Sequence, residues 1–312
     1  MVTDVKSPIR LAMLGMVDGN GHPYSWSAMF NGYDREAMAD CPYAGIPEYL
    51  DKQPPDTVRI PGAAVTHIWT DDPADAQHVA RCSLIPTVVE RAEDVIGQVD
   101  AVIVATDRGD EHVARCRPFV EAGIPVFVDK PLVDNRADLD VFRAWIAEGR
   151  PIMSSSCMRY AKEYMPYRAS TAELGDLRFV SITTPKSWER YGIHALEAIY
   201  PILGPGFLTA RNTGSAERNV VHLTHSRGVD AVVIASSDMY GAFGALTLAG
   251  TKGHVQVSFR DTFYAFQTQL RAMLDWLRTG NPPYPFSETD ELMRLVIAGI
   301  DSRAAGGTEI RV

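Results

Sequence analysis

One stretch, residues 100–132, constrains the fold more than any other part of the chain: it reads DAVIVATDRGDEHVARCRPFVEAGIPVFVDKPL. Ala101–Ala105 is an apolar, β-branched run, which is typical of a strand buried on both faces. Glu111–Ala122 carries apolar residues at helical spacing, and Gly123 after it suits a helix C-cap. Pro125–Val128 predicts a second buried strand. The stretch therefore predicts a parallel βαβ unit.

The second of these strands leads into Asp129-Lys130-Pro131. In an open parallel sheet, ligands bind beyond the carboxyl ends of the strands. Pro131 restricts the backbone of Lys130 to extended conformations, so the lysine is held in place. We therefore predict that Lys130 exchanges a proton with a substrate oxygen. The alternative interpretation is a surface Asp–Lys pair that follows a strand.

Length and charge limit the classes of protein to which the chain can belong. A chain of 312 residues is long enough for two domains, and its net charge of -9 argues against nucleic acid or an anionic membrane as a partner. No apolar run approaches the roughly 18 residues that a membrane helix needs, and the short run Leu11–Val17 reads as a strand rather than a secretory signal. We therefore expect a cytoplasmic protein.

Cysteine and histidine spacing points the same way. The four cysteines are widely spaced and form no C-x-x-C pair, as in a reduced, cytoplasmic chain. His222 and His225 form an H-x-x-H, but on an extended chain they face opposite sides. We predict no metal site.

The N-terminal region has the layout of a dinucleotide-binding domain, with one irregularity. Ile9–Gly15 reads as the first strand, and the turn after it should carry G-x-G-x-x-G, so that backbone amides meet a pyrophosphate. Gly15 fits the first position, whereas Gly19 and Gly21 are shifted. Asp18 places a negative charge where phosphates are expected. The turn is thus the weakest part of the dinucleotide interpretation.

Val65–Thr70 reads as the second strand and ends at Asp71. An acid at this point accepts hydrogen bonds from the adenosine ribose and repels a 2′-phosphate, so we expect NAD(H), with NADP(H) less favoured. The alternative is that Asp71 and Asp72 only cap the next helix. A Pro- and Tyr-rich insertion, Gly32–Ala63, should contain a short helix near Pro47–Lys52. It could cover the cofactor cleft, support a subunit contact or be a surface excursion.

Residues 100–132 also resemble a known family. The runs DAVIVAT, EAG and VDKPL, together with His112, resemble the core of the Gfo/Idh/MocA oxidoreductases, whose signature is Glu-Lys-Pro; here Asp129 stands in place of the Glu. The resemblance implies that Lys130 is the catalytic lysine beside a nicotinamide. The residues that we expect to hold the cofactor are Gly15, Gly19, Gly21, Asp71, Thr106, His112, Asp129 and Lys130.

A helix at Tyr191–Gly204 resembles the family's Gly-x-His-x-x-Asp helix, whose histidine points at the substrate. The resemblance implies a catalytic role for His194, whose imidazole can take a hydroxyl proton as the hydride leaves. Glu197, three residues later, lies on nearly the same helix face and could orient it. The alternative is a buried structural histidine.

The substrate side departs from the family pattern, because Arg190 stands where many members carry an Asp four residues before the histidine. We predict that the substrate is bound by Arg159, Tyr160, Lys186, Arg190 and Tyr191. The three cationic residues suit a carboxylate or phosphate, so an acidic sugar or hydroxy acid is one hypothesis. Alternatively, Arg190 points to solvent or pairs with Glu189 or Glu197.

Together these features predict a two-domain α/β protein. Residues 1–157 should form a Rossmann domain with a doubly wound parallel sheet, and residues 158–312 an α+β domain for substrate binding and oligomerisation, with an open, mostly antiparallel sheet. An uncovered sheet face implies a homodimer or homotetramer. The predicted function is an NAD(H)-dependent oxidoreductase that acts on a hydroxyl or carbonyl carbon of a sugar, sugar acid or related small molecule. The alternatives are a non-catalytic nucleotide- or ligand-binding protein of the same fold, and a lyase or hydrolase that uses NAD transiently.

Overall fold

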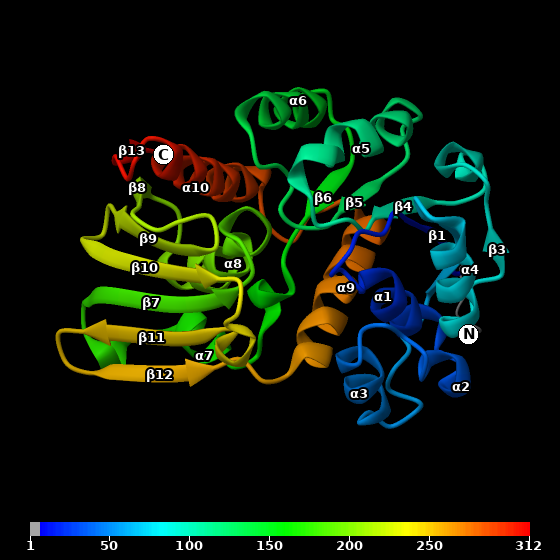
Figure 1. Ribbon diagram of the computed structural model, residues 1–312, viewed down its shortest axis with the longest axis horizontal. Coiled ribbons are helices and arrows are strands. Elements are labelled where there is room, and N and C mark those ends of the chain that lie inside the picture. Colours follow the sequence, from blue (N-terminus) through cyan, green and yellow to red (C-terminus); the bar gives the residue numbers. More distant parts are fainter. Residues whose placement is uncertain (1–6) are drawn as a thin grey trace, which may run out of the picture.

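The structure, a computed structural model, describes residues 7–312 and contains two β-sheets (Figure 1). The first is parallel, with the strand order β3-β2-β1-β4-β5-β6. Its strands are β1 (Ile9–Leu14), β2 (Ala63–Trp69), β3 (Thr87–Val88), β4 (Ala101–Val104), β5 (Val126–Val128) and β6 (Ile152–Ser154). The order reverses between β1 and β4, as in a doubly wound dinucleotide-binding sheet. The predicted Rossmann sheet and its βαβ unit are confirmed.

Helices cover both faces of this sheet. The core on one face includes α1 (His22–Asn31), α4 (Pro73–Cys82) and α9 (Thr262–Thr279), and the core on the other includes α5 (His112–Glu121) and α6 (Arg136–Ala147). α9 comes from the C-terminal half of the sequence, yet its residues Leu270 and Met273 pack into the same core as Leu11 of β1. The C-terminal half therefore supplies part of the cover of the first sheet.

The second sheet is mixed, with the order β12-β11-β7-β10-β9-β8-β13. Its strands are β7 (Leu177–Pro185), β8 (Phe207–Asn212), β9 (Arg218–His225), β10 (Val229–Ser236), β11 (Ala245–Gly250), β12 (His254–Ser258) and β13 (Ile310–Arg311). All pairs are antiparallel except β7 with β10, which run parallel. The predicted open, mostly antiparallel sheet is confirmed. The parallel pair arises because a helix and two strands separate β7 from β10 in the chain.

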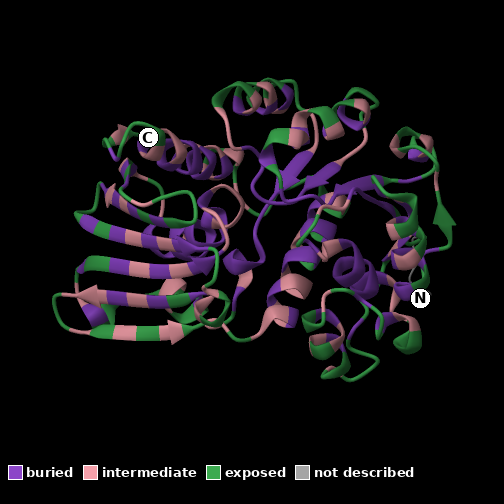
Figure 2. Cartoon of the chain, in the orientation of Figure 1, coloured by how far each residue is buried: buried purple, intermediate pink, exposed green. Residues whose placement is uncertain are grey.

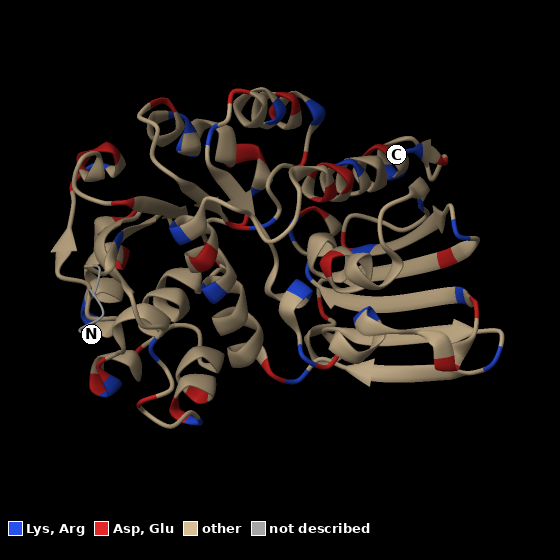
Figure 3. Ribbon diagram, turned by 180° about the vertical axis from the view of Figure 1, so that it is seen from behind, with Lys and Arg blue, Asp and Glu red and all other residues tan. Residues whose placement is uncertain are grey.

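Only one face of the second sheet is covered by helices. α8 (Ile193–Leu203) and α10 (Phe286–Ala304) pack with the buried residues of β7 to β11 in one core. Along β9 and β10, buried residues alternate with exposed or partly exposed residues, which lie on the other face (Figure 2). These strands carry few charged side chains (Figure 3).

The insertion between α1 and β2 contains α2 (Arg35–Met38) and α3 (Gly45–Asp51), so the predicted short helix is confirmed. It folds back onto the glycine-rich turn, where a Cβ on Gly21 would lie 2.6 Å from Cδ1 of Ile46 and 2.7 Å from Cδ2 of Tyr43. The remaining helical elements are short: η1 (Ala92–Val95), η2 (Gly109–Glu111), η3 (Cys157–Tyr160), α7 (Met165–Ala169), η4 (Ala172–Leu174), η5 (Trp188–Gly192) and η6 (Tyr240–Ala242).

Candidate functional site

Lys130 lies at the carboxyl end of β5 and is almost fully buried, with 2% of its side chain exposed. Its ammonium Nζ lies 3.5 Å from Oδ2 of Asp107 and 4.7 Å from the ring centroid of Tyr191. Burial by itself would lower the pKa of Lys130, but the carboxylates of Asp129 and Asp107 outweigh it and raise this pKa above the usual lysine value. The lysine is therefore a protonated donor at neutral pH.

Asp129 is the fully buried acid that stands where the family has Glu. Its Oδ2 accepts hydrogen bonds from Asn20 (2.9 Å) and His22 (2.7 Å), and its Oδ1 accepts one from the backbone N–H of Lys130 (2.7 Å). Burial would raise the pKa of Asp129, but His22 and Lys130 hold it well below the usual value. Asp129 thus ties the glycine-rich turn to the lysine.

Asp107 is a site residue that the sequence analysis missed. It follows β4, is buried, and its Oδ1 accepts hydrogen bonds from Nη2 (2.5 Å) and Nε (3.2 Å) of Arg190. Burial would raise its pKa, but Lys130 and Arg190 together lower it, so Asp107 is ionised. Its position just after a predicted parallel strand could have identified Asp107 from the sequence, because ligands bind beyond the carboxyl ends of such strands.

Arg190 and Lys186 reach from the second sheet to the glycine-rich turn. Nη2 of Arg190 donates to the carbonyl of Asp18 (3.0 Å), and Nζ of Lys186 donates to that of Gly19 (2.7 Å). Lys186 has a left-handed φ of +59°, a strained conformation for a residue with a Cβ. Burial lowers its pKa to about 8. Of the pairings weighed for Arg190, neither occurs, because Asp107 is its carboxylate partner.

His194 is in the first turn of α8 and is buried. Its Nδ1 lies 2.7 Å from Oγ of Ser156, and its ring meets that of Tyr191 edge to face at 4.6 Å between centroids. Burial, and then the charge of Lys130, lower the pKa of His194 well below its usual value, so the imidazole is neutral. Ser156, rather than the predicted Glu197, orients it.

Glu197 belongs to a separate ion-pair network with Arg159. It accepts from Nε of Arg159 and from the backbone N–H of Ser156 (3.1 Å), while Nη1 of Arg159 donates to Glu288 (2.7 Å). Arg159 and Tyr160 line a pocket of about 320 Å³ between η3, the end of α8 and the start of α10. Two carboxylates therefore pair with Arg159 away from Lys130, while its buried Nη2 has no hydrogen-bond partner among the described residues. The substrate-binding role of Arg159 and Tyr160 stays a prediction.

His112 joins two loops of the site. Its two ring nitrogens lie 2.9 Å from the carbonyl oxygens of Leu132 and Thr106. This joins the loop after β4 to the loop after β5, and both His112 and Thr106 are fully buried. Both ring nitrogens thus contact protein carbonyls, and the predicted contact of His112 with a cofactor stays a prediction.

The glycine-rich turn meets part of what a dinucleotide needs. Gly15 has a φ of +83°, and a Cβ there would lie 2.8 Å from Cγ2 of Thr106, so only glycine fits. Gly19 also has a positive φ. Asn20 accepts from the N–H of His22 (3.0 Å), the first residue of α1. The turn is thus tight, but its first helical N–H and two of its carbonyls already have protein partners.

The adenosine side of the sheet offers a better fit. A pocket of about 380 Å³ lies at the carboxyl ends of β1, β2 and β4, where Leu14, Trp69 and Val104 form part of its wall. Asp71 follows β2 beside it and is half-exposed; its Oδ1 accepts from Nη2 of Arg115 (3.0 Å). Since a dinucleotide places its adenosine at these strand ends, the residues present fit this group.

A larger cleft of about 1020 Å³ separates the insertion and α1 from the second sheet. His22 and Tyr191 line it, whereas Lys130 lies behind them. Its wall contains seven Tyr and Phe rings: Tyr43, Tyr49, Tyr191, Tyr240, Phe243, Phe263 and Phe266. The insertion therefore forms one side of this aromatic cleft.

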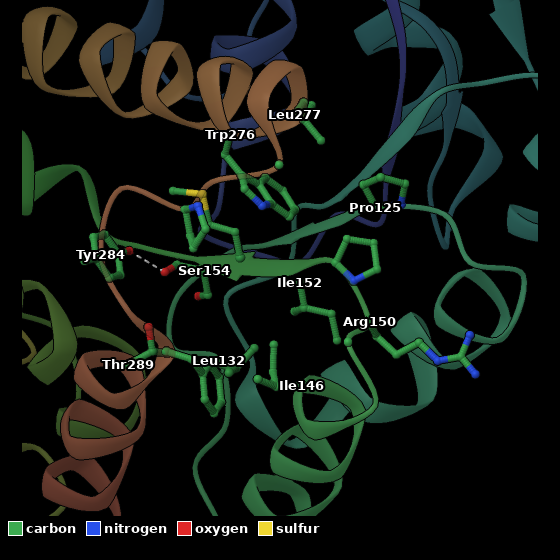
Figure 4. Close-up of a pocket in the computed structure, with 16 residues that line it drawn as sticks. Pro125, Leu132, Ile146, Arg150, Ile152, Ser154, Trp276, Leu277, Tyr284 and Thr289 are labelled. Carbon is green, nitrogen blue, oxygen red and sulfur yellow. Dashed lines mark hydrogen bonds between the residues drawn. The ribbon is translucent and has the colours of Figure 1, made fainter.

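Another pocket, of about 400 Å³, runs along the edge strand β6 (Figure 4). Ile152, Leu132 and Trp276 form much of its apolar wall, and the hydroxyl of Tyr284 donates to the carbonyl of Ser154 (2.7 Å). Its lining contains neither Lys130 nor Asp107, Asp129, Tyr191 or His194.

Two features are absent from the described part of the chain, a metal-binding cluster and a membrane-spanning helix. Among residues 7–312, no group of three or more His, Cys, Asp or Glu side chains is arranged to hold a metal ion. Within the same range, none of the helices combines the length and the apolar character needed to cross a membrane.

Comparison with known proteins gives a family for the first sheet. Residues 48–148 match the Gfo/Idh/MocA model, described as "Oxidoreductase family, NAD-binding Rossmann fold". The match begins after the glycine-rich turn. A "Putative UDP-kanosamine synthase oxidoreductase subunit" of Amycolatopsis mediterranei (strain S699) is 30% identical over 111 residues, which is 36% of this chain and 31% of that protein. The match thus spans about a third of this relative's length.

Solved structures extend the likeness in fold to the whole chain. Myo-inositol 2-dehydrogenase from Lactobacillus plantarum is 16% identical with a TM-score of 0.75, covering 98% of this chain and 100% of that one. Myo-inositol dehydrogenase from Lactobacillus casei, solved with NAD(H) and myo-inositol, is 15% identical with a TM-score of 0.74 and coverages of 98% and 97%. Such identities show the fold alone. The resemblance found in the sequence is confirmed: residues 48–148 match the NAD-binding Rossmann model of the Gfo/Idh/MocA oxidoreductase family, and the whole chain has the fold of these two dehydrogenases.

Proposed function

We propose that this protein is an NAD(H)-dependent oxidoreductase that acts on a hydroxyl or carbonyl carbon of a sugar or related small molecule. The observation that carries the proposal is the buried ammonium of Lys130, held by Asp107 and Asp129 directly behind the wall of the aromatic cleft. The nicotinamide cofactor, when bound, supplies the hydride chemistry.

Lys130 would act on the oxygen of the reacting carbon. Because its pKa is raised, it is a donor at neutral pH, and in the reducing direction it passes a proton to the oxygen that becomes a hydroxyl. In the oxidising direction a neutral Lys130 takes that proton back. Lys130 is only 2% exposed, so the side chains of His22 and Tyr191 must part to admit the oxygen.

His194 would assist as a neutral imidazole. Ser156 holds its Nδ1, which leaves Nε2 as the nitrogen that can accept a hydrogen bond or proton from a substrate hydroxyl. Tyr191, between Lys130 and His194, would contact the substrate from the cleft wall. Aromatic rings with a few placed polar groups suit a sugar ring, which is apolar on its C–H faces and polar at its rim.

The cofactor would be held at the carboxyl ends of β1, β2 and β4. Asp71 would accept hydrogen bonds from the adenosine ribose and disfavour a 2′-phosphate, which gives the preference for NAD(H) over NADP(H). Gly15, Gly19 and Gly21 would form the turn, and Thr106 and Asp129 its floor.

We also propose that residues 1–157 and 158–312 form two units and that copies of the chain join through the uncovered face of the second sheet as a homo-oligomer. A cytoplasmic location, which we propose as well, suits the four free, buried cysteines.

A second candidate function, a binding protein without turnover, rests on the closed arrangement of the site. Lys186 and Arg190 bond to carbonyls of the turn, and Lys130 is covered. A transient use of NAD in a lyase or hydrolase reaction is a third possibility, which predicts that NAD stays bound through purification and undergoes no net reduction.

Titration with NADH and NADPH tests the proposal, because Trp69 lines the adenosine pocket and its fluorescence should be quenched on binding. We expect NADH to bind more tightly than NADPH. Failure of both to bind would refute the proposed function, and equal or tighter binding of NADPH would refute the role of Asp71. Binding of NADH, with no oxidation or reduction across a panel of sugars, polyols and sugar acids, would favour the binding protein.

A further inference from the structure

Arg115 on α5 lies in the adenosine pocket but has no role in the function proposed above. Its side chain is 19% exposed and lines the 380 Å³ adenosine pocket. Nε donates to Oε2 of Glu111 (2.9 Å), and Nη2 lies 3.0 Å from Oδ1 of Asp71 and 2.8 Å from Oε2 of Glu111. Two carboxylates therefore fix the plane of the guanidinium at the mouth of the cofactor site.

These contacts use Nε and Nη2, while Nη1 points to the glycine-rich turn. It lies 3.3 Å from the position that a Cβ on Gly15 would occupy, beside the methyl group of Thr106. The guanidinium thus extends from the acid at the end of β2 to the first glycine after β1. In a Rossmann sheet this path joins the adenosine ribose to the pyrophosphate.

The turn itself is poorly equipped to meet a pyrophosphate. Asp18 brings a negative charge, and the N–H of His22, which begins α1, already donates to Asn20. The cations Lys186 and Arg190 are engaged with the turn's own carbonyls. A site with these features needs a positive charge from elsewhere to hold two phosphates.

We propose that Arg115 is the cofactor-positioning residue of this site: Nη1 meets the pyrophosphate above Gly15, while Nη2 holds Asp71 in place for the ribose. The inference rests on the proposed function and adds to it a residue that lies outside the glycine-rich turn. Arginine suits the task because its planar fork binds a carboxylate and a phosphate at once.

An arginine at this point could instead bind a 2′-phosphate, but the surroundings disfavour it. Asp71 and Glu111 already flank the guanidinium, and Glu90 and Glu93 lie in the pocket wall. The same wall contains one further cation, Arg91, which is paired with Asp94 (2.8 Å). A 2′-phosphate would face this acidic group, whereas a pyrophosphate above Gly15 would lie on the side of Nη1.

The test compares Arg115→Met with Arg117→Met, a matched control on the same helix. Arg117 is 49% exposed and pairs only with Glu121 (3.7 Å) among the salt bridges of the described residues, so both variants lose one positive charge from α5. Binding of NADH, ADP, adenosine and adenosine 2′,5′-bisphosphate is measured by calorimetry, after circular dichroism and thermal melting show that each variant is folded.

We expect Arg115→Met to lower the affinity for NADH and ADP by roughly 10- to 100-fold, because a charged hydrogen bond to the pyrophosphate is lost. The affinity for adenosine, which has no phosphate, should fall by only a few-fold. Arg117→Met should bind all four like the wild type, and Arg115→Lys should recover part of the affinity for ADP.

Unchanged affinity of Arg115→Met for NADH and ADP would overturn the role of Arg115 and leave the proposed function standing. A selective loss of adenosine 2′,5′-bisphosphate would overturn it in favour of a 2′-phosphate contact. A wild type that binds none of the four ligands would overturn the proposed function and the role of Arg115 together.

Discussion

Lys130 and Asp107 form a buried ion pair, in which Nζ lies 3.5 Å from Oδ2 and the two side chains are 2% and 1% exposed. The same carboxylate accepts a hydrogen bond from Arg190 of η5, which follows β7 of the second sheet. One acid that follows a strand of the first sheet therefore joins the proposed proton donor to the C-terminal half of the chain. Asp107 thus brings a carboxylate to the site, although position 190, where the family pattern has an acid, carries an arginine.

Replacement of Lys130 by Ala should lower turnover by about 10²-fold or more, the usual contribution of a positioned proton-transfer group. The variant should still fold, because both buried carboxylates retain hydrogen-bond partners: Asp107 remains bonded to Arg190, and Asp129 to His22 and Asn20. Lys130→Arg should not restore turnover, since a guanidinium cannot release its proton at working pH. The measurement is NADH absorbance with a substrate found by screening. Near-normal turnover in Lys130→Ala would remove the lysine from the mechanism.

The charge of the substrate can be tested with a sugar and its uronic acid. Of the three cations that suggested an acidic substrate, Arg159 and Arg190 are paired with carboxylates. Among the salt bridges of the described residues none involves Lys186, whose ammonium donates to the carbonyl of Gly19. If the substrate is acidic, Lys186→Met should lower kcat/KM for the uronic acid about tenfold relative to the sugar, because one charged contact with the carboxylate is lost. Arg190→Met should affect both alike. Selective loss of the acid in Arg190→Met would show that Arg190 leaves Asp107 to bind substrate.

His194 should make the protein less stable in acid. Its folded pKa is lowered by burial and by Lys130, whereas the unfolded value is about 6.5, so below pH ~6.5 the unfolded state binds more protons. The stability of the wild type should therefore fall from pH 7 towards pH 5, by up to about 1.4 kcal/mol per pH unit from this residue. His194→Gln should show a shallower decline in melting temperature. The exposed His254→Gln is the control, and parallel curves for wild type and His194→Gln would contradict the buried, neutral imidazole.

The uncovered face of the second sheet should join copies of the chain. Val232 lies in its centre, paired with His222 on one side and Ser181 on the other, and is only partly buried. We expect a homodimer or homotetramer by light scattering, and Val232→Arg should dissociate it, because a buried unpaired charge is strongly unfavourable at an interface. Val88→Arg, on the edge strand of the other sheet, should leave the mass unchanged. A monomeric wild type would refute the proposed assembly.

The sequence by itself determined the elements and the location of the key lysine. Ala101–Ala105 and Pro125–Val128 are apolar over their whole length, and only a sheet covered on both faces buries such runs, so the parallel sheet and the strand-end position of Lys130 followed from local pattern. Strand-like segments that follow one another with few helices between them likewise predicted the mostly antiparallel second sheet.

Side-chain pairing was decided only by the tertiary structure. Arg190 and Asp107 are 83 residues apart in the sequence, and Arg159 and Glu288 are 129 apart. Neither sequence pattern nor spacing predicts which of such distant residues pair. Spacing on one helix predicted that Glu197 orients His194, but a buried arginine competes more strongly for a carboxylate than a neutral imidazole does, so Glu197 pairs with Arg159 and Ser156 takes its place. Local periodicity determines which residues are buried, whereas the partners of buried charges depend on the packing of the two sheets.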